Sequence, residues 1–174
     1  MERALVTDPI IGGILNWLHV ISAIGWLGAA MVFGMILSPA LTSMTPGGRG
    51  EFMLKIVPKY AKYVSLLIVS TLVFGAALAL YMAYGGGSFY FSGQWGMSIM
   101  AGAGTALLVA ILGLGIIIPS LRKIVKLVTQ MQANPAASAP PELAKLQGRV
   151  RVGSMVGMVL LFLVVVFMVA AAWS

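Results

Sequence analysis

Four long apolar stretches constrain this chain more than any other feature of its sequence. They cover about residues 10–38, 64–84, 96–118 and 149–173, and apart from two arginines at the entry of the last they contain no Asp, Glu, Lys or Arg. About 20 apolar residues suffice for a helix to cross a bilayer. Only 9% of the residues are charged and 60% are hydrophobic, whereas soluble domains have roughly 25% charged residues. The sequence therefore predicts an all-α polytopic membrane protein, with four transmembrane helices in a bundle that forms a single domain.

Turn and capping residues indicate where the predicted helices end. Asp8 followed by Pro9 is typical of a helix start, and Pro39 is expected to end the first helix. The uncharged aromatic segment 85–95 is predicted to be a loop, which either belongs to the interfacial belt or contacts a ligand. Residues 133–141, rich in Ala and Pro, are predicted to form a mobile linker.

Small and hydroxylated residues predict which helix faces pack closely. Thr71 and Gly75 lie one turn apart in the second apolar stretch, and Gly153 and Gly157 form a G-x-x-x-G pair in the fourth. Such residues let helix backbones approach each other within a membrane. We therefore expect both pairs to face neighbouring helices.

Two of the three connections between the spans are basic. Segment 51–63 is amphipathic and is predicted to be either a helix on the membrane surface or the entry to the second span, while Pro119 is expected to kink the third helix into a basic amphipathic extension. Basic loops face the cytoplasm. We therefore expect a plasma-membrane protein with both termini extracytoplasmic, and anionic lipid headgroups as partners of the cytoplasmic segments. The net charge of +7 then requires no nucleic-acid partner.

Several site types are excluded by composition. The chain has no cysteine, which rules out disulfides, thiolate metal sites and cysteine nucleophiles. No carboxylate in a span could orient a histidine for Ser-His-Asp chemistry. No catalytic residue is predicted, and the sequence favours a non-enzyme while leaving an enzyme open.

The N-terminal segment lacks the basic region and cleavage site of a signal peptide, so the first apolar stretch is expected to remain as a span.

The only histidine of the chain, His19, lies within the first span. Ionisable residues at membrane depth indicate a functional site or a polar contact inside a bundle. His19 belongs to a stripe of small or polar residues that also includes Trp26. The members of this stripe are Gly12, Asn16, His19, Ala23, Trp26 and Ala30. We expect the stripe to face the bundle, with Asn16 beside the histidine.

Methionines are the other metal-binding side chains available at the level of His19. Met100 begins the third helix and Met168 ends the fourth, and Met82 and Met97 lie at the same end of the spans. Histidine with thioether ligands suits copper(I), and one His with one Met can hold a haem iron. Methionine also fills gaps in apolar packing. The sequence leaves both roles open.

The segment from His19 to Gly28, HVISAIGWLG, resembles the first-helix signature of the CopD-like membrane proteins, which include the copper-resistance D family. The H-x6-W spacing of His19 and Trp26 is also similar to that of the HemJ family of protoporphyrinogen oxidases. Pro39, Thr71 and Gly75 are similar to the family layout more loosely. The resemblance implies a four-helix bundle that handles copper or haem b. It implies His19 as metal or haem ligand, with Trp26 in the cofactor site.

Two hypotheses follow. In the first, the protein binds copper or haem b through His19, with Met100 and Met168 as further metal ligands. In the second, the protein is a non-catalytic accessory subunit of a larger membrane complex, or a homo-oligomer, and His19 only forms a hydrogen bond between helices.

Overall fold

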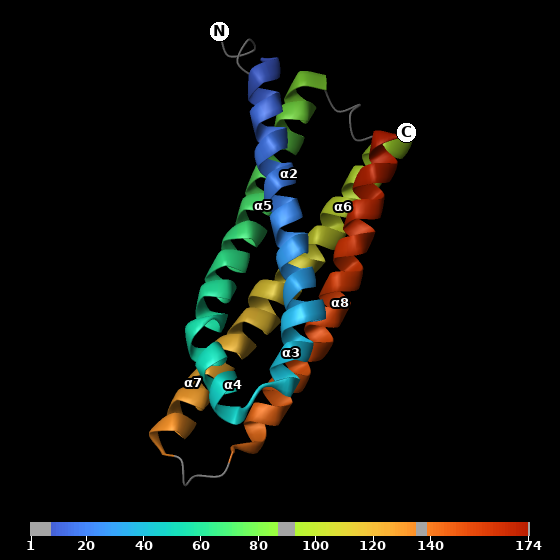
Figure 1. Cartoon of the computed structure of the whole chain (residues 1–174). Coiled ribbons are helices and arrows are strands. Elements are labelled where there is room, and N and C mark those ends of the chain that lie inside the picture. The colour runs from blue at the N-terminus through green and yellow to red at the C-terminus, as the bar shows by residue number, and fades with distance from the viewer. Residues whose placement is uncertain (1–7, 87–92, 135–138, 174) are drawn as a thin grey trace. The chain divides into compact units, whose positions relative to one another are not determined.

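The computed structural model describes residues 8–86, 93–134 and 139–173, and every regular element in these residues is helical (Figure 1). The α-helices are α2 (Pro9–Met31), α3 (Ser38–Ser43), α4 (Pro46–Lys55), α5 (Val57–Gly86), α6 (Gly93–Leu112), α7 (Ile118–Ala133) and α8 (Pro141–Ala172), with π-helical turns η1 (Val32–Leu37) and η3 (Gly113–Ile117). Four helical segments are long and apolar enough to cross a membrane: Pro9–Ser43, Val57–Tyr84, Gly93–Ala133 and Pro141–Ala172. The predicted all-α architecture with four spans is confirmed.

The first helix starts where the sequence predicts. The Asp8 carboxylate accepts a hydrogen bond of 2.9 Å from the backbone N–H of Ile10, and Pro9 is the first helical residue. The side chain therefore satisfies one of the amide groups that a helix start leaves without a partner. Proline costs nothing here because its missing N–H would have no helical partner.

The prediction that Pro39 ends the first helix is wrong. Helix continues to Ser43, because the turn before the proline widens to π geometry: the Ser38 N–H bonds to the Phe33 carbonyl, five residues back. A π-helical turn changes the hydrogen-bond pattern before the proline, so that the helix can continue although proline has no N–H to donate. The same arrangement precedes Pro119, where the Ile118 N–H bonds to the Gly113 carbonyl. The predicted basic extension then follows as α7.

The other helix starts differ from the predicted ones by several residues. Segment 51–63 divides at Ile56, so that its first part ends α4 and its second part begins α5 at Val57. Pro58 explains the division, because it cannot donate a hydrogen bond to the preceding turn. Helix α8 begins already at Pro141, since its polar first turns are helical as well. Hydropathy finds the apolar part of a helix and misses a polar extension.

The predicted loop and linker lie partly outside the described residues. Gly85 and Gly86 belong to the end of α5, and Gly93 to Trp95 belong to the start of α6, while residues 87–92 are outside the described part. The linker is bounded by the end of α7 at Ala133 and the start of α8 at Pro141, and its residues 135–138 are also outside.

The chain forms two compact units. Unit 1 comprises Met1–Leu27, Leu67–Val109 and Val159–Ser174, and unit 2 comprises Gly28–Leu66 and Ala110–Met158. Unit 1 contains His19, and unit 2 contains both π-helical turns and the basic segments.

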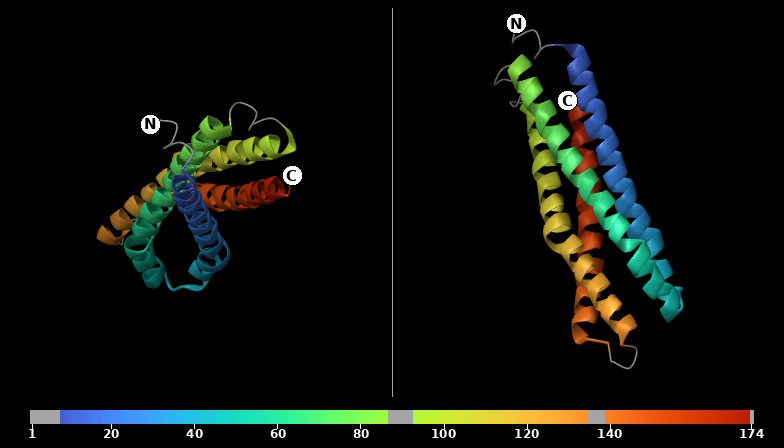
Figure 2. Two further views of the ribbon diagram at one scale, coloured as in Figure 1. Left: turned by 90° about the horizontal axis from the view of Figure 1, so that it is seen from above. Right: turned by 90° about the vertical axis from the view of Figure 1, so that its left-hand side faces the viewer.

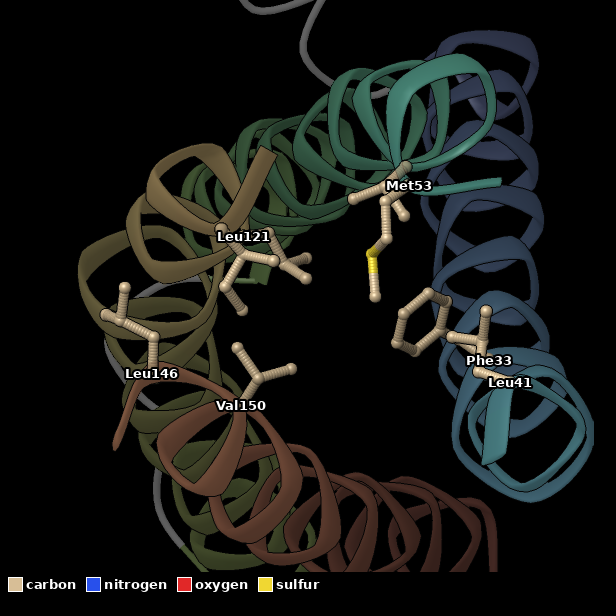
Figure 3. Close-up of a cluster of buried hydrophobic side chains, with 8 residues drawn as sticks. Phe33, Leu41, Met53, Leu121, Leu146 and Val150 are labelled. Carbon is tan, nitrogen blue, oxygen red and sulfur yellow. The ribbon is translucent and has the colours of Figure 1, made fainter. Parts of the chain in front are cut away.

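Unit 2 is built around one hydrophobic cluster (Figure 3). Its buried members are Phe33, Leu41, Met53, Val57, Leu121, Ile124, Leu146 and Val150. In Figure 3 the side chains of Met53, Phe33, Leu121 and Val150 point toward one another from different helices. The Phe33 ring also stacks on Tyr60, with ring centroids 4.5 Å apart. One cluster thus joins η1, α3, α4, α5, α7 and α8.

The G-x-x-x-G pair of α8 packs as predicted. Gly153 and Gly157 are both buried. A Cβ placed on Gly153 would lie 3.2 Å from Cγ1 of Ile117 in η3. The missing side chain therefore lets α8 approach the π-helical turn closely.

In unit 1, α2 and α5 lie side by side, as Figures 1 and 2 show for the blue and green helices. A Cβ on Gly12 would lie 2.6 Å from the Tyr81 ring, and a Cβ on Gly25 would lie 3.0 Å from the Leu67 side chain. The Tyr81 hydroxyl donates a hydrogen bond of 2.7 Å to the carbonyl of Asp8. These contacts hold α2 and α5 close together on both sides of His19 along the helix axis.

Candidate functional site

His19 is held by the backbone of α5. Its Nδ1 lies 2.9 Å from the carbonyl oxygen of Thr71, and the side chain is half-buried. A carbonyl oxygen only accepts hydrogen bonds, so Nδ1 carries a hydrogen; the imidazole tautomer with this hydrogen has its lone pair on Nε2. No hydrogen bond from the described residues reaches Nε2. The ring is therefore oriented through one nitrogen and has the other available as a ligand.

Gly75 makes room for this imidazole. A Cβ at Gly75 would lie 2.8 Å from both Cε1 and Nδ1 of His19, which is closer than real side-chain contacts. Gly75 follows Thr71 by one helical turn, so both residues lie on the same face of α5. Any larger residue at position 75 would push the ring away from its carbonyl partner.

The Thr71 side chain does not compete for the histidine. Thr71 is buried, with 5% of its surface exposed, and its hydroxyl donates a hydrogen bond of 2.7 Å to the Leu67 carbonyl in its own helix. Residue 71 thus presents a backbone carbonyl to His19 and satisfies its hydroxyl locally. The sequence predicted that Thr71 and Gly75 form a packed face, and nothing in it indicated that the histidine would bond to main chain.

The stripe predicted around His19 is correct in part. Trp26 is buried, with 4% of its surface exposed, and Gly12, Ala23 and Ala30 are half-buried. Asn16 is exposed, so the prediction that it lies beside His19 inside the bundle is wrong.

Helix geometry explains the error at Asn16. Three residues turn an α-helix by about 300°, so Asn16 and Ser22 diverge to opposite sides of His19. The buried face includes the Ser22 side, and Ser22 is 6% exposed. Ser22, which the sequence pattern did not single out, is the buried polar residue one turn from the half-buried histidine. A small hydroxyl three residues after the histidine was the signal that could have found it.

The two methionines proposed as metal ligands differ in their surroundings. Met168 packs on α6, since a Cβ on Gly102 would lie 2.8 Å from its Cε and 3.5 Å from its sulfur. Met100 is 57% exposed. The structure thus places Met168 against α6 and leaves Met100 largely exposed.

Metal donors of other types are sparse. Within the described part of the chain, no group of three or more His, Cys, Asp or Glu side chains could hold a metal ion. A metal ion at His19 would therefore need thioether ligands, backbone ligands or ligands from a second chain.

Comparison with protein-family models, with curated proteins and with solved structures yields no match for this chain.

Proposed function

We propose that this multi-pass membrane protein binds haem iron or copper(I) through Nε2 of His19. The observation that carries the proposal is the 2.9 Å contact between Nδ1 of His19 and the Thr71 carbonyl. Histidines that bind metals almost always donate their other ring N–H to a carbonyl, carboxylate or water, which fixes the tautomer and the ring orientation. His19 has this arrangement, and the resemblance of the HVISAIGWLG segment to CopD-like proteins supports the same role.

The donor types proposed for this site fit these two groups better than hard cations. Imidazole nitrogen suits copper and haem iron, and thioether sulfur suits copper(I), whereas magnesium and calcium require oxygen ligands. Met168 and Met100 are the proposed sulfur donors, and Trp26 is the proposed aromatic contact of the cofactor. A bound haem or copper ion would supply one-electron redox chemistry. The chain's own part is to orient the imidazole through Thr71 and Gly75.

The test is a spectrum and a metal analysis of the protein purified natively in mild detergent. We expect a haem Soret band, or copper in stoichiometric amount, and we expect His19→Ala to lose it. Asn16→Ala is the matched control, because Asn16 lies one turn away and is exposed. Preparations that contain neither group, and that show no saturable binding of added haem or copper(I), would contradict the proposal.

A second function, an accessory subunit without a cofactor, is favoured by one feature of the same site. The bond to Thr71 and the space at Gly75 already form a complete helix–helix contact without any ligand. In this case His19→Ala lowers stability and changes no spectrum, and the wild-type protein comigrates with a partner subunit in mild detergent. A solitary monomer with unchanged stability on His19→Ala would count against this alternative.

We also propose that both termini are extracytoplasmic, because segments 49–62 and 122–151 are basic and short basic connections are usually cytoplasmic. The chain has no cysteine, so a single introduced cysteine is a unique label site. Trp173→Cys, at the exposed residue that follows α8, should react in intact cells with a membrane-impermeant maleimide. Thr129→Cys, exposed on α7, should react only after the cells are opened. The reverse pattern would contradict this orientation.

A further inference from the structure

Charge is distributed very unevenly over the two units. Ten of the 11 Lys and Arg residues belong to unit 2, together with two glutamates, which gives ten minus two, or +8. The described residues of unit 1 hold one charged side chain, Asp8. Nine of the ten basic residues of unit 2 are exposed. They are Lys55, Lys59, Lys62, Arg122, Lys123, Lys126, Lys145, Arg149 and Arg151, and we call them the basic surface.

The basic surface stands on helices that the hydrophobic cluster fixes in place. In α7, Leu121 and Ile124 are buried in the cluster, while Arg122 and Lys123 between them are exposed. The other helices that carry basic residues have the same organisation. Their cluster members are Met53 in α4, Val57 in α5, and Leu146 and Val150 in α8. The backbone under the charges is therefore ordered before any ligand binds, which lowers the entropic cost of binding.

The acidic residues offset little of this charge. Lys55 donates a hydrogen bond to Glu51 one turn earlier, and this contact lowers the pKa of the exposed Glu51 carboxyl. Glu51 is therefore ionised at neutral pH and compensates Lys55. The three basic residues of α7 have no acidic neighbour on their own helix.

An apolar groove of about 430 Å³ lies on α4, the helix that packs against α7. Met44, Phe52 and Ile56 form its apolar wall, and the ion pair of Lys55 with Glu51 lines it as well. The uncompensated cations are those of α7, which packs against α4. An apolar groove on one helix and exposed cations on its neighbour match a ligand that has a hydrocarbon part and an anionic part.

We propose that the basic surface of unit 2 binds anionic phospholipids, with the phosphate groups on Lys and Arg and an acyl chain along the α4 groove. Charge complementarity is the argument for this occupant, because basic residues next to a span are attracted to anionic headgroups. A soluble phosphate would use the cations and leave the groove unexplained. This inference does not depend on a cofactor at His19.

Lipid titration with native mass spectrometry tests the proposal on the full chain in detergent. Phosphatidylglycerol should bind at least about tenfold more tightly than phosphatidylcholine with the same acyl chains, because each nearby basic residue contributes about fivefold. The triple variant Arg122→Gln, Lys123→Gln, Lys126→Gln should lose most of this preference. Inorganic phosphate at the same concentration should not displace the lipid.

Two further variants separate charge from folding. The charge-retaining variant Arg122→Lys, Lys123→Arg, Lys126→Arg should keep the preference for phosphatidylglycerol. Arg149→Gln with Arg151→Gln, on α8, should reduce it independently of α7. Equal binding of the two lipids by the wild type would overturn the proposal. So would undiminished preference in the neutral α7 variant, or full displacement by inorganic phosphate, which would indicate a free-anion site.

Discussion

Replacement of Gly75 by alanine is expected to displace the His19 imidazole and to lower the free energy of unfolding by about 1–3 kcal/mol. The new Cβ would lie 2.8 Å from two ring atoms, so the ring must move and the bond between Nδ1 and the Thr71 carbonyl is lost. In most helical positions the same exchange gains up to about 1 kcal/mol of helix propensity. The sign of the effect therefore reports the contact. Unfolding in mixed detergent micelles, followed by circular dichroism, measures it.

Gly104→Ala is the matched control for this prediction. Gly104 lies in α6, and a Cβ there meets nothing within 4 Å, so its exchange should leave stability unchanged or raise it. If His19 binds a cofactor, Gly75→Ala should also weaken that binding while Gly104→Ala should not. Equal stability of the two variants would show that the imidazole does not lie against Gly75.

Ile124→Ala is expected to destabilise unit 2 by about 2–5 kcal/mol, the range for removing a large buried aliphatic side chain. Ile124 lies in the hydrophobic cluster with 2% of its surface exposed, among residues from other helices. Since those neighbours are held by several helices, they cannot all move to fill the cavity. Thermal unfolding in detergent should show a lower midpoint.

Ile111→Ala removes the same atoms from an exposed position and serves as the comparison. Ile111 is 58% exposed in α6, so detergent or lipid replaces the lost contacts and the effect should stay below about 1 kcal/mol. Similar losses in the two variants would mean that the cluster does not form the core of unit 2.

Much of the helical architecture could be predicted from hydropathy and capping residues. The four spans, the start at Asp8 and the basic extension after Pro119 depend on local properties, namely side-chain apolarity, a capping carboxylate and helical periodicity. Where local rules compete, prediction fails. Proline normally ends a helix. At Pro39 the helix continues, because the preceding π-helical turn allows the Ser38 N–H to bond to the Phe33 carbonyl.

The sequence predicted individual residues of the candidate site but not all of their neighbours. The sequence identified His19 as the ionisable residue inside a span and indicated that its helix has a face with small residues. Whether Asn16 or Ser22 accompanies the histidine depends on a rotation of about 60° to either side, which spacing alone leaves open. The structure buries Ser22 and exposes Asn16.

Composition and periodicity were sufficient to predict a membrane protein with four spans and basic connections between them. Each of these features depends only on the side chains within one stretch of the sequence. The environment of His19 required the packed structure. Its partner is a carbonyl 52 residues away in sequence, and every residue carries a carbonyl, so no side-chain pattern could single out that of Thr71. The role of Gly75 is visible only when α5 packs against α2, because the space left by its missing side chain is then occupied by the His19 ring.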